Sequence, residues 1–421
     1  MTNILMKPFR ALRPQASAAA GVIAPPYDVL NTQEARQRAA GKPNSFLHIS
    51  KPEIDLPEGT DPFAAEVYSG GANSLNRLVD TGVLRREQHP CYYAYQLEMQ
   101  GHVQTGVAGV GSVAAYRANR IRKHELTRPV KEDDRVNQII SLGVQTGPVL
   151  LAYRSRPDIK SWLAEIVATE APLYDLPADD GVIHRIWRID APERFTAAFE
   201  AMPALYIADG HHRSAAASRV TDDLIRAGTA GELSNYFLSV AFPHDEMRIL
   251  DYNRVVADTN GLSETGLLDA LATNFKITPL DSAQKPAEAT HFSMYLNGRW
   301  YGLALDPQRV AQDPVGRLDV SLLQAQLLTP TLGIDDPRCD PRIDFVGGIR
   351  GLQELQRRVD DQRGGVAFAL FPTAMEDLMA VADANELMPP KSTWFEPKLA
   401  DGLLSHVIAS LEPEPQPAPS S

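Results

Sequence analysis

Residues 206–213 read Tyr-Ile-Ala-Asp-Gly-His-His-Arg, and the sequence continues as Ser-Ala-Ala-Ala-Ser to residue 218. The apolar run 204–208 is typical of a buried strand, and the alanine-rich segment to about residue 225 favours a helix. Gly210, between them, can adopt backbone conformations that are closed to other residues. A strand, a glycine turn and a helix whose first N–H groups are unpaired together form an anion site. The stretch therefore predicts a phosphate-binding turn.

The polar side chains of this turn allow two interpretations. A histidine beside a helix start is often a cap or a satisfied core group, and an arginine there often forms a surface salt bridge. The complete string, however, places Asp209 beside the donors of His211, His212 and Arg213, all of which can bind phosphate oxygens. The full combination favours a turn that binds phosphate and takes part in phosphoryl transfer.

Composition limits the partners of the chain. The 421 residues include 41 basic and 53 acidic ones, which gives a formal net charge of −12. Such a chain has no general attraction for nucleic acid or for an anionic membrane, so we expect neither as a partner. An anionic ligand must instead be held by a local basic cluster.

The cysteines and the N-terminus indicate the cellular setting. Cys91 and Cys339 are far apart and lack the spacing of metal ligands, which favours a reducing, cytoplasmic compartment. Residues 1–14 lack the apolar core of a signal peptide, and no stretch has the apolar length needed to cross a bilayer. The sequence predicts a soluble protein and leaves its oligomeric state open, a homodimer included.

A second polar cluster occupies residues 121–135, Ile-Arg-Lys-His-Glu-Leu-Thr-Arg-Pro-Val-Lys-Glu-Asp-Asp-Arg. Most charge runs of this kind are solvated loops or helix faces. Here the charges alternate in sign around His124 and Glu125, which allows a compact, mutually paired cluster. A glutamate among basic groups can act as a general base or hold a divalent metal. The residues alone leave the two interpretations equal.

Two proline-rich stretches carry further polar groups. Residues 25–28, Pro-Pro-Tyr-Asp, form either a rigid corner or the rim of a pocket with Tyr27 and Asp28 facing a ligand. Residues 388–398, Met-Pro-Pro-Lys-Ser-Thr-Trp-Phe-Glu-Pro-Lys, hold donors suited to phosphate or carboxylate; these are Lys391, Ser392, Thr393 and Lys398. Taken singly, both stretches favour the structural interpretation.

Strand and helix patterns alternate through the middle of the chain, which predicts an α/β (mixed α+β) fold. Hairpins are expected at residues 91–113 and 291–305, and residues 45–50 alternate like a strand. We expect an N-terminal α/β region at 1–115, a core at 116–260 that carries both motifs, and a C-terminal α/β region at 261–410 that closes the site. The proline-rich tail 411–421 is expected to be disordered.

Several of these strings together resemble domain-of-unknown-function family 1015. The strings are Ala-Pro-Pro-Tyr-Asp-Val at 24–29, Phe-Leu-His-Ile and Lys-Pro-Glu-Ile-Asp within 46–55, His-Glu-Leu-Thr and Lys-Glu-Asp-Asp-Arg within 124–135, and the stretches 206–213 and 388–398. They span nearly the whole chain, which is identified as a member of that family.

The Asp-Gly-His-His-Arg turn is also similar to the signature of the ParB and sulfiredoxin-like superfamily, in which a Gly-x-x-Arg turn at a helix start grips nucleotide phosphates. Free-serine kinases of that superfamily carry the turn after a His-Glu pair and a further glutamate. This chain has the same order, with His124-Glu125, then Glu132, then residues 209–213. The spacing from Glu125 to Glu132 is one residue longer, and the intervening segment 137–205 is much longer. These departures put the role of Glu132 in question.

The resemblance implies a ParB/sulfiredoxin-like nucleotide-binding core, elaborated by additional strands and helices. It further implies an enzyme that transfers the terminal phosphoryl group of a nucleotide to the hydroxyl of free L-serine, giving O-phospho-L-serine. ATP is favoured over ADP as donor, and Mg²⁺ would bridge the phosphate oxygens. The metal ligands are not assigned.

The implied site residues fall into three groups. The catalytic group has Glu125 as general base together with His124, Asp209 and Glu132; the nucleotide-binding group is Gly210, His211, His212, Arg213 and Ser214; and the substrate-binding group is Tyr27, Asp28, Arg135, Lys391, Ser392 and Thr393. Within the last group, Asp28 would receive the serine ammonium and Lys391 the serine carboxylate.

Three other classes compete with the kinase. A ParB-like regulatory protein would bind or hydrolyse nucleotide without a small-molecule acceptor, although the acidic balance disfavours a DNA-bound version. Sulfiredoxin-like chemistry needs a nucleophilic cysteine near the turn, and neither cysteine lies within the motif. A purely structural protein leaves three polar clusters unexplained.

Overall fold

The computed structural model describes residues 4–362 and 365–408, which divide into two compact units. The large unit comprises the described parts of Met1–Met247 and Pro397–Ser421, and the small unit comprises Arg248–Glu396. This partition differs from the predicted segments, because strands from both 1–115 and 116–260 share one sheet. Residues 397–408 return to the large unit instead of staying with 261–396. The predicted disordered tail, 411–421, lies outside the described residues.

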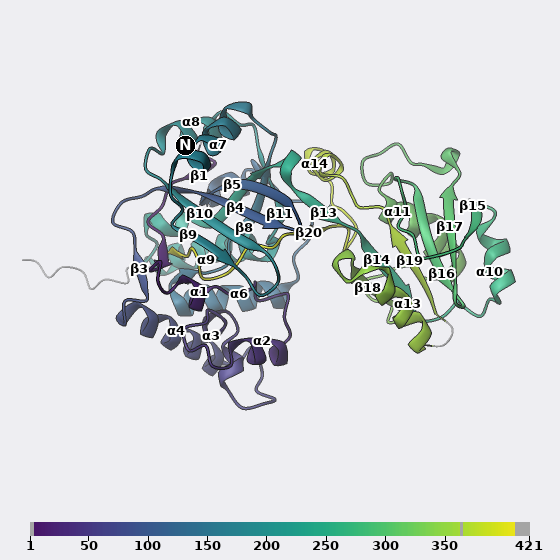
Figure 1. Cartoon of the computed structure of the whole chain (residues 1–421), viewed down its shortest axis with the longest axis horizontal. Helices are drawn as coiled ribbons and strands as arrows, with labels where there is room; N and C mark the ends of the chain where they lie inside the picture. Colours follow the sequence, from purple (N-terminus) through teal and green to yellow (C-terminus); the bar gives the residue numbers. More distant parts are fainter. Residues whose placement is uncertain (1–3, 363–364, 409–421) are drawn as a thin grey trace, which may run out of the picture. The chain divides into compact units, whose positions relative to one another are not determined.

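A nine-stranded mixed sheet forms the centre of the large unit (Figure 1). Its strands are β1 (Met6–Lys7), β4 (Tyr92–Met99), β5 (His102–Ser112), β6 (Ile121–Arg122), β8 (Val149–Tyr153), β9 (Tyr174–Pro177), β10 (Ile183–Ile189), β11 (Leu205–Asp209) and β12 (Tyr236–Pro243). Their order is β6-β11-β8-β12-β5-β4-β10-β9, and β1 pairs with β5. The predicted hairpin at residues 91–113 is confirmed as β4 and β5. The mixed α/β class is confirmed as well.

Helices cover this sheet and complete its core. They are α5 (Val113–Arg117), α6 (Pro129–Leu142), α7 (Pro157–Thr169), α8 (Glu193–Glu200) and α9 (His211–Ala227), with short 3₁₀ turns at Glu232–Asn235 and His244–Glu246. Tyr92 and Ala94 of β4 pack with Phe195 and Phe199 of α8 in one apolar cluster. Helices α6 and α9 pack against each other through a separate apolar contact that includes Val136 and Val220. Burial of these apolar faces holds the helices to the sheet.

A smaller helical layer is built from the N-terminal region. It contains β2 (Leu12–Pro14), α1 (Ala19–Val22), α2 (Thr32–Ala39), α3 (Leu47–Ser50), a 3₁₀ turn (Pro52–Asp55), α4 (Ala65–Asp80) and β3 (Leu84–Arg86). The strand predicted at residues 45–50 is wrong, because α3 forms there. Phe46, Leu47 and Ile49 are all buried in one cluster with α4, so this segment has no alternating exposed face. A single helical turn brings all three side chains to the same core.

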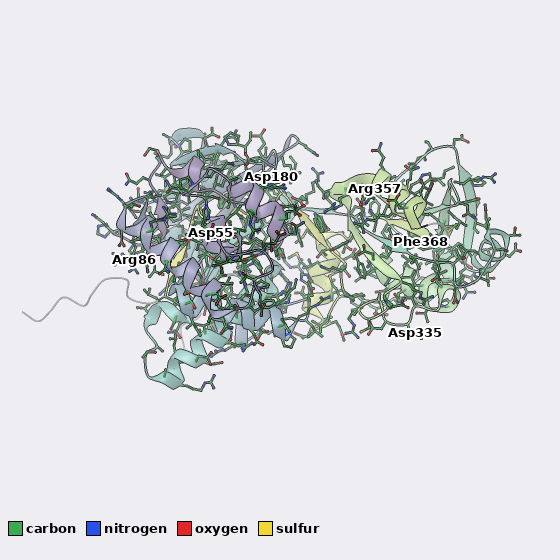
Figure 2. All side chains as sticks on the ribbon, turned by 90° about the horizontal axis from the view of Figure 1, so that it is seen from below. Asp55, Arg86, Asp180, Asp335, Arg357 and Phe368 are labelled. Carbon is green, nitrogen blue, oxygen red and sulfur yellow. The ribbon has the colours of Figure 1, made fainter. Side chains whose placement is uncertain are left out.

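The small unit is built on a six-stranded antiparallel sheet of order β15-β17-β16-β19-β14-β18. The strands are β14 (Tyr252–Val256), β15 (Phe275–Leu280), β16 (His291–Leu296), β17 (Arg299–Leu305), β18 (Ile343–Gly347) and β19 (Val366–Leu370), and β13 (Arg248–Leu250) pairs separately with β20 (Trp394–Glu396). The helices are α10 (Glu264–Leu271), α11 (Asp319–Leu323), α12 (Thr329–Leu332), α13 (Gly351–Gln362) and α14 (Met375–Asp383), with a π-turn at Gln324–Leu328 and 3₁₀ turns at Pro307–Arg309 and Gly348–Arg350. Phe368 on β19 is fully buried, whereas Arg357 on α13 pairs with Asp361 at the surface (Figure 2).

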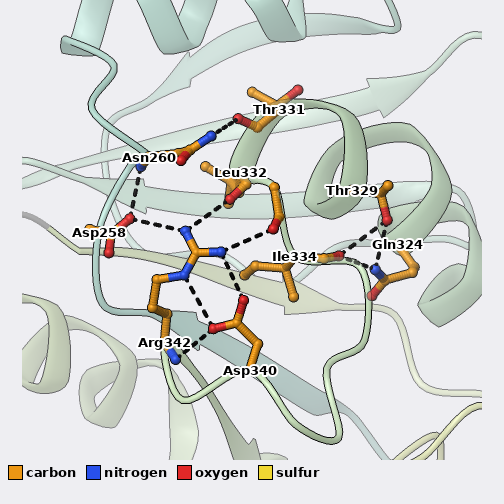
Figure 3. A network of polar contacts seen from close by, with 10 residues as sticks. Asp258, Asn260, Gln324, Thr329, Thr331, Leu332, Ile334, Asp340 and Arg342 are labelled. Atoms are coloured by element: carbon orange, nitrogen blue, oxygen red, sulfur yellow. Dashed lines mark hydrogen bonds and ion pairs between the residues drawn. The ribbon is translucent and has the colours of Figure 1, made fainter.

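Arg342 contacts several connecting segments of the small unit (Figure 3). The guanidinium of Arg342 donates to both oxygens of Asp340 and to the carbonyls of Leu332 and Gly333. It also lies 3.5 Å from Asp258, which follows β14. Arg342 therefore joins the end of α12 to the chain that enters β18. This network explains a charge cluster of the small unit without invoking a ligand.

None of the helices within residues 4–362 and 365–408 combines the length and the apolar character that spanning a bilayer requires. The two cysteines are both free; Cys91 is buried and Cys339 is exposed.

Candidate functional site

Two parallel strands bring the two polar motifs together. β6 and β11 pair in parallel, with Leu205 opposite Ile121 and Tyr206 opposite Arg122. Because parallel neighbours end at the same edge of a sheet, the segments that follow them leave side by side. The backbone N–H of His124 donates to Nε2 of His211 over 3.4 Å. The motifs predicted at 121–135 and 206–213 thus meet at one sheet edge.

The turn between β11 and α9 depends on Gly210. Its φ of +98° lies in the left-handed region, and its N–H donates to Oδ1 of Asp209 over 2.9 Å. A Cβ at this position would lie 3.3 Å from Nε of Arg213 and 3.3 Å from Cα of Val149. The turn therefore needs glycine both for its backbone conformation and for the packing of the arginine.

Replacing Gly210 with alanine is expected to lower the free energy of unfolding by about 2–3 kcal/mol, because the backbone strain at positive φ and the crowding of the new Cβ against Arg213 and Val149 add to each other. Gly228, at the other end of α9, also has positive φ, but a Cβ there would meet nothing within 4 Å. Gly228→Ala should therefore cost only the backbone strain, about 1 kcal/mol. Denaturant titration of the two variants separates the two contributions, and equal losses would contradict the crowding at Gly210.

Two imidazoles and a carboxylate form the centre of the site. The rings of His124 and His211 meet edge to face, with centroids 4.5 Å apart. Nδ1 of His211 lies 4.0 Å from Oε2 of Glu125. Because Nε2 of His211 accepts the His124 N–H, the ring proton belongs on Nδ1 and faces Glu125. Both imidazoles are buried, whereas the Glu125 side chain is 43% exposed and within reach of a small molecule.

Both histidines are neutral at physiological pH. Burial lowers the pKa of His124 to about 4, against the opposing effects of the Ile207 carbonyl and Asp209. Burial and the neighbouring His124 take the pKa of His211 well below its usual range. Neither ring therefore supplies a standing positive charge, and a bound phosphate must obtain one from other residues.

His212 lies on the other side of the same turn. Its Nε2 accepts the backbone N–H of Arg128 over 3.0 Å, which leaves the proton on Nδ1. Burial and the nearby Lys131 lower the pKa of His212, although Asp28 opposes the shift. The ring is only partly buried and can donate one hydrogen bond to an anion at the turn.

Arg213 and Lys398 supply the positive charge. Arg213 donates to the Pro148 carbonyl, and its Nη2 lies 3.5 Å from Oδ2 of Asp209. Nζ of Lys398 is 3.4 Å from the same oxygen. Burial alone would raise the pKa of Asp209, but these two cations hold it below its usual range, so the carboxylate is ionised. The pKa of Arg213 is raised despite burial, chiefly by Asp209 and Asp28.

A pocket opens beside Arg213. Its polar wall contains Tyr27, Arg135, Gly147 and Asp401. The Arg135 guanidinium stacks over the Tyr27 ring at 3.8 Å, and burial raises the pKa of Tyr27 to about 12. Of the Pro-Pro-Tyr-Asp stretch, Tyr27 thus lines this pocket, and the predicted role of Tyr27 and Asp28 in facing a ligand stays a prediction.

A family model described as "Protein of unknown function (DUF1015)" matches residues 6–321. The chain belongs to this family. The solved structures that resemble it include a free serine kinase variant in complex with AMP, at 12% identity and a TM-score of 0.35, covering 70% of this chain and 92% of that chain. A conserved hypothetical protein from Pyrococcus furiosus is 13% identical with a TM-score of 0.34, and the match covers 70% of this chain and 94% of that chain. C-terminally truncated SbnI from Staphylococcus aureus is 10% identical with a TM-score of 0.39, and the match covers 71% of this chain and 87% of that chain. Comparison with curated proteins found no match.

Other predicted residues of this DUF1015 protein have partners that suggest supporting roles. Glu132 accepts from Thr127 over 2.7 Å and from Arg219 of α9 over 3.0 Å, so its carboxylate joins α6 to α9. Ser214 is fully buried and donates to the His211 carbonyl. Asp28 is exposed, close enough to Arg213 and His212 to affect their pKa values.

Of the remaining predicted residues, Arg135 has several partners in the large unit, and the others belong to the small unit. Arg135 donates to Asp134 and Gln138 in addition to stacking on Tyr27. Lys391, Ser392 and Thr393 belong to the small unit, where the Lys391 ammonium lies 5.6 Å from the Tyr252 ring centroid. Their role in substrate binding stays a prediction.

The predicted site did not include Asp401, which lines the pocket, or Lys398, which faces Asp209. Asp401 and Lys398 lie beyond the part of the chain matched to the DUF1015 model. Lys398 is the last residue of the proline-rich stretch 388–398, and its place among the donors of that stretch was a signal that it could bind an anion. Asp401 precedes Gly402, whose φ is +90°, and an Asp-Gly pair predicts only a turn.

His124, Glu125 and His211 could hold a metal ion, because one ligand atom from each lies within 4.8 Å of the others. Two imidazoles and one carboxylate suit transition metals better than Mg²⁺, which prefers oxygen ligands. Mg²⁺ would therefore have to be held mainly by the phosphate oxygens of a nucleotide, with Glu125 as a single protein ligand.

Proposed function

We propose that this DUF1015 protein is a kinase that transfers the terminal phosphoryl group of a nucleotide to the hydroxyl of free L-serine. The observation that carries the proposal is the position of the Glu125 carboxylate, 4.0 Å from His211 at the start of α9. A proton acceptor and a phosphate-binding corner next to each other are the two parts that phosphoryl transfer requires. The motif order that resembles free-serine kinases supports the same activity.

The start of α9 binds the phosphates in this proposal. The first turn of the helix offers unpaired backbone N–H groups, and His212 adds a donor from its Nδ1. Arg213 supplies the fixed positive charge that offsets the charge developing on the transferred group. His211 and the turn at Gly210 complete the binding corner. Asp209 positions Arg213, and buried His124 positions His211 through its backbone N–H.

Glu125 acts as general base. Its carboxylate takes the proton of the acceptor hydroxyl, and the hydroxyl oxygen then forms a bond to the terminal phosphorus. The bond from that phosphorus to the bridging oxygen breaks, and the shortened nucleotide leaves. ATP is the favoured donor, with ADP as the alternative, and Mg²⁺ bound to the phosphates would neutralise part of their charge. Glu132 and Ser214 hold the surrounding helices in place.

The test is to incubate the protein with Mg²⁺ and ATP or ADP, and with L-serine, L-threonine or L-homoserine in separate reactions. We expect ³¹P NMR to show O-phospho-L-serine, formed in equal amount to the nucleotide product. Release of inorganic phosphate alone would contradict the kinase and favour a ParB-like protein that hydrolyses nucleotide without an acceptor. Mn²⁺ in place of Mg²⁺ tests whether the two imidazoles favour a transition metal.

A further inference from the structure

The C-terminal segment 397–408 returns to the large unit and adds residues to the site (Figure 1). Asp401 exchanges two backbone hydrogen bonds with Ala24, immediately before the Pro-Pro-Tyr-Asp stretch. Further along, β21 (His406–Val407) pairs with β7 (Val144–Gln145), which leads to Gly147. The segment is thus fixed at both ends of the pocket wall.

The Asp401 side chain faces the pocket with an unsatisfied oxygen. The residue is 1% exposed, and within the described chain its Oδ1 has no hydrogen-bond partner. A Cβ on Gly147 would lie 3.2 Å from this oxygen and 3.3 Å from Cδ of Arg213. The absence of a side chain at Gly147 therefore leaves a space with a carboxylate on one side and a guanidinium on the other.

A buried carboxylate oxygen without a donor is costly, so its retention indicates a ligand that supplies the donor. The charged groups facing Asp401 are Arg213 of α9, Arg135 of α6 and Asp28. Burial raises the pKa of Asp401 to about 7, Asp28 adds to the rise, and the two arginines and the Tyr27 backbone oppose it. Such strongly perturbed groups in a pocket are typical of binding and catalytic residues.

We propose that Asp401 binds the ammonium group of the acceptor substrate. The acceptor class is then a small hydroxylated α-amino acid, not a hydroxy acid or a polyol. This inference rests on the proposed kinase function and replaces exposed Asp28 as the ammonium partner. Arg135 and Arg213 line the same pocket and provide cations for the carboxylate of such a substrate.

The chemistry of the pocket explains the selectivity. An ammonium group has three N–H donors and a positive charge, so it can donate a charge-assisted hydrogen bond to Oδ1 of Asp401. The ammonium group of L-serine supplies both the hydrogen-bond donor and the positive charge. Glycerate has the same 3-hydroxyl and carboxylate, but its neutral 2-hydroxyl brings one donor and no charge to Asp401. A hydrogen bond to a carboxylate is stronger when its donor is charged, so the site should favour L-serine.

The main test is Asp401→Asn, which keeps the shape of the side chain and removes its charge. We expect KM for L-serine to rise about 10–150-fold, the range for losing a hydrogen bond to a charged group, with kcat and nucleotide affinity nearly unchanged. The preference for L-serine over glycerate should fall by a similar factor. An unchanged KM, or an equal loss of nucleotide binding, would overturn the assignment.

The pH profile gives an independent measurement. The wild-type KM for L-serine should fall as pH rises through about 7, because Asp401 gains its charge over that interval while the serine ammonium keeps its own. Asp401→Asn should remove this dependence. A variant that keeps the wild-type profile would contradict the assignment.

Two further measurements separate folding and function. Gly147→Ala places a methyl group beside Oδ1 without changing any charge and should raise KM for L-serine, which keeps the inference testable if Asp401→Asn does not fold. If the wild type phosphorylates no amino acid, the proposed function fails. Calorimetry with L-serine then decides: binding by the wild type that the Asp401→Asn variant loses supports the ammonium site, and equal or absent binding in both overturns it.

Discussion

Replacing Glu125 with glutamine is expected to lower kcat for serine phosphorylation by about 10²–10⁴-fold, the usual contribution of a general base. The amide keeps the size of the side chain but cannot take the hydroxyl proton. Nucleotide affinity should stay within about 3-fold of wild type, because Glu125 is not among the residues assigned to the phosphates. Single-turnover kinetics with labelled ATP, together with a nucleotide titration, measure the two quantities separately.

The structure offers a control for this substitution. Glu165 on α7 is also partly exposed, with its side chain at 62%, and its carboxylate lies 3.5 Å from Arg194 at the surface. Glu165→Gln should leave kcat unchanged. Full turnover by Glu125→Gln would show that the base is assigned wrongly. Loss of nucleotide binding in that variant would instead indicate that Glu125 holds a metal with His124 and His211.

Local signals predicted much of the fold. The pair Asn297-Gly298 has positive φ at both residues, as the predicted hairpin of β16 and β17 requires. The apolar strand, glycine and alanine-rich helix around Gly210 were likewise predicted from adjacent residues. The segment at 45–50 failed because burial on every side removes the periodicity that distinguishes a strand from a helix.

The site was predictable only where its residues are close in sequence. The His-Glu pair and the turn at residues 209–213 were each found from their own residue types. Their proximity depends on parallel pairing of β6, a strand of two residues that carries no periodicity. Lys398 and Asp401 come back to the large unit after the whole of the small unit, and local sequence does not encode such a contact.

Replacing Arg213 with alanine is expected to weaken nucleotide binding about 10–100-fold and to lower the free energy of unfolding by about 3 kcal/mol. That loss is at the lower end for breaking a buried ion pair, because Lys398 still faces Asp209 and Arg135 still faces Asp401. Titration with nucleotide and denaturation by urea measure the two losses.

The loss of stability should grow with pH. The folded-state pKa of Asp209 is depressed, so its pairing stabilises the fold above the unfolded pKa of about 4 and is lost in acid. Asp401 is the opposite case: its pKa is raised to about 7, so ionising it destabilises the fold as pH rises from about 4 to 7. Without Arg213, the first contribution shrinks and the second increases. The change in the Asp401 contribution makes the variant relatively weaker at pH 8 than at pH 4, whereas the change in the Asp209 contribution is already present at pH 4 and disappears only in stronger acid.

Arg219 provides the matched control on the same helix. Its guanidinium pairs with Glu132 and Asp133 in a more exposed position, so Arg219→Ala should cost at most about 1 kcal/mol and leave nucleotide affinity intact. Arg213→Lys keeps the charge but loses the planar guanidinium, and should recover more stability than nucleotide affinity. Arg213 supplies the fixed positive charge of the proposed phosphate site at the start of α9. If the Arg213→Ala variant binds nucleotide as tightly as the Arg219→Ala variant does, phosphate is not bound at that site.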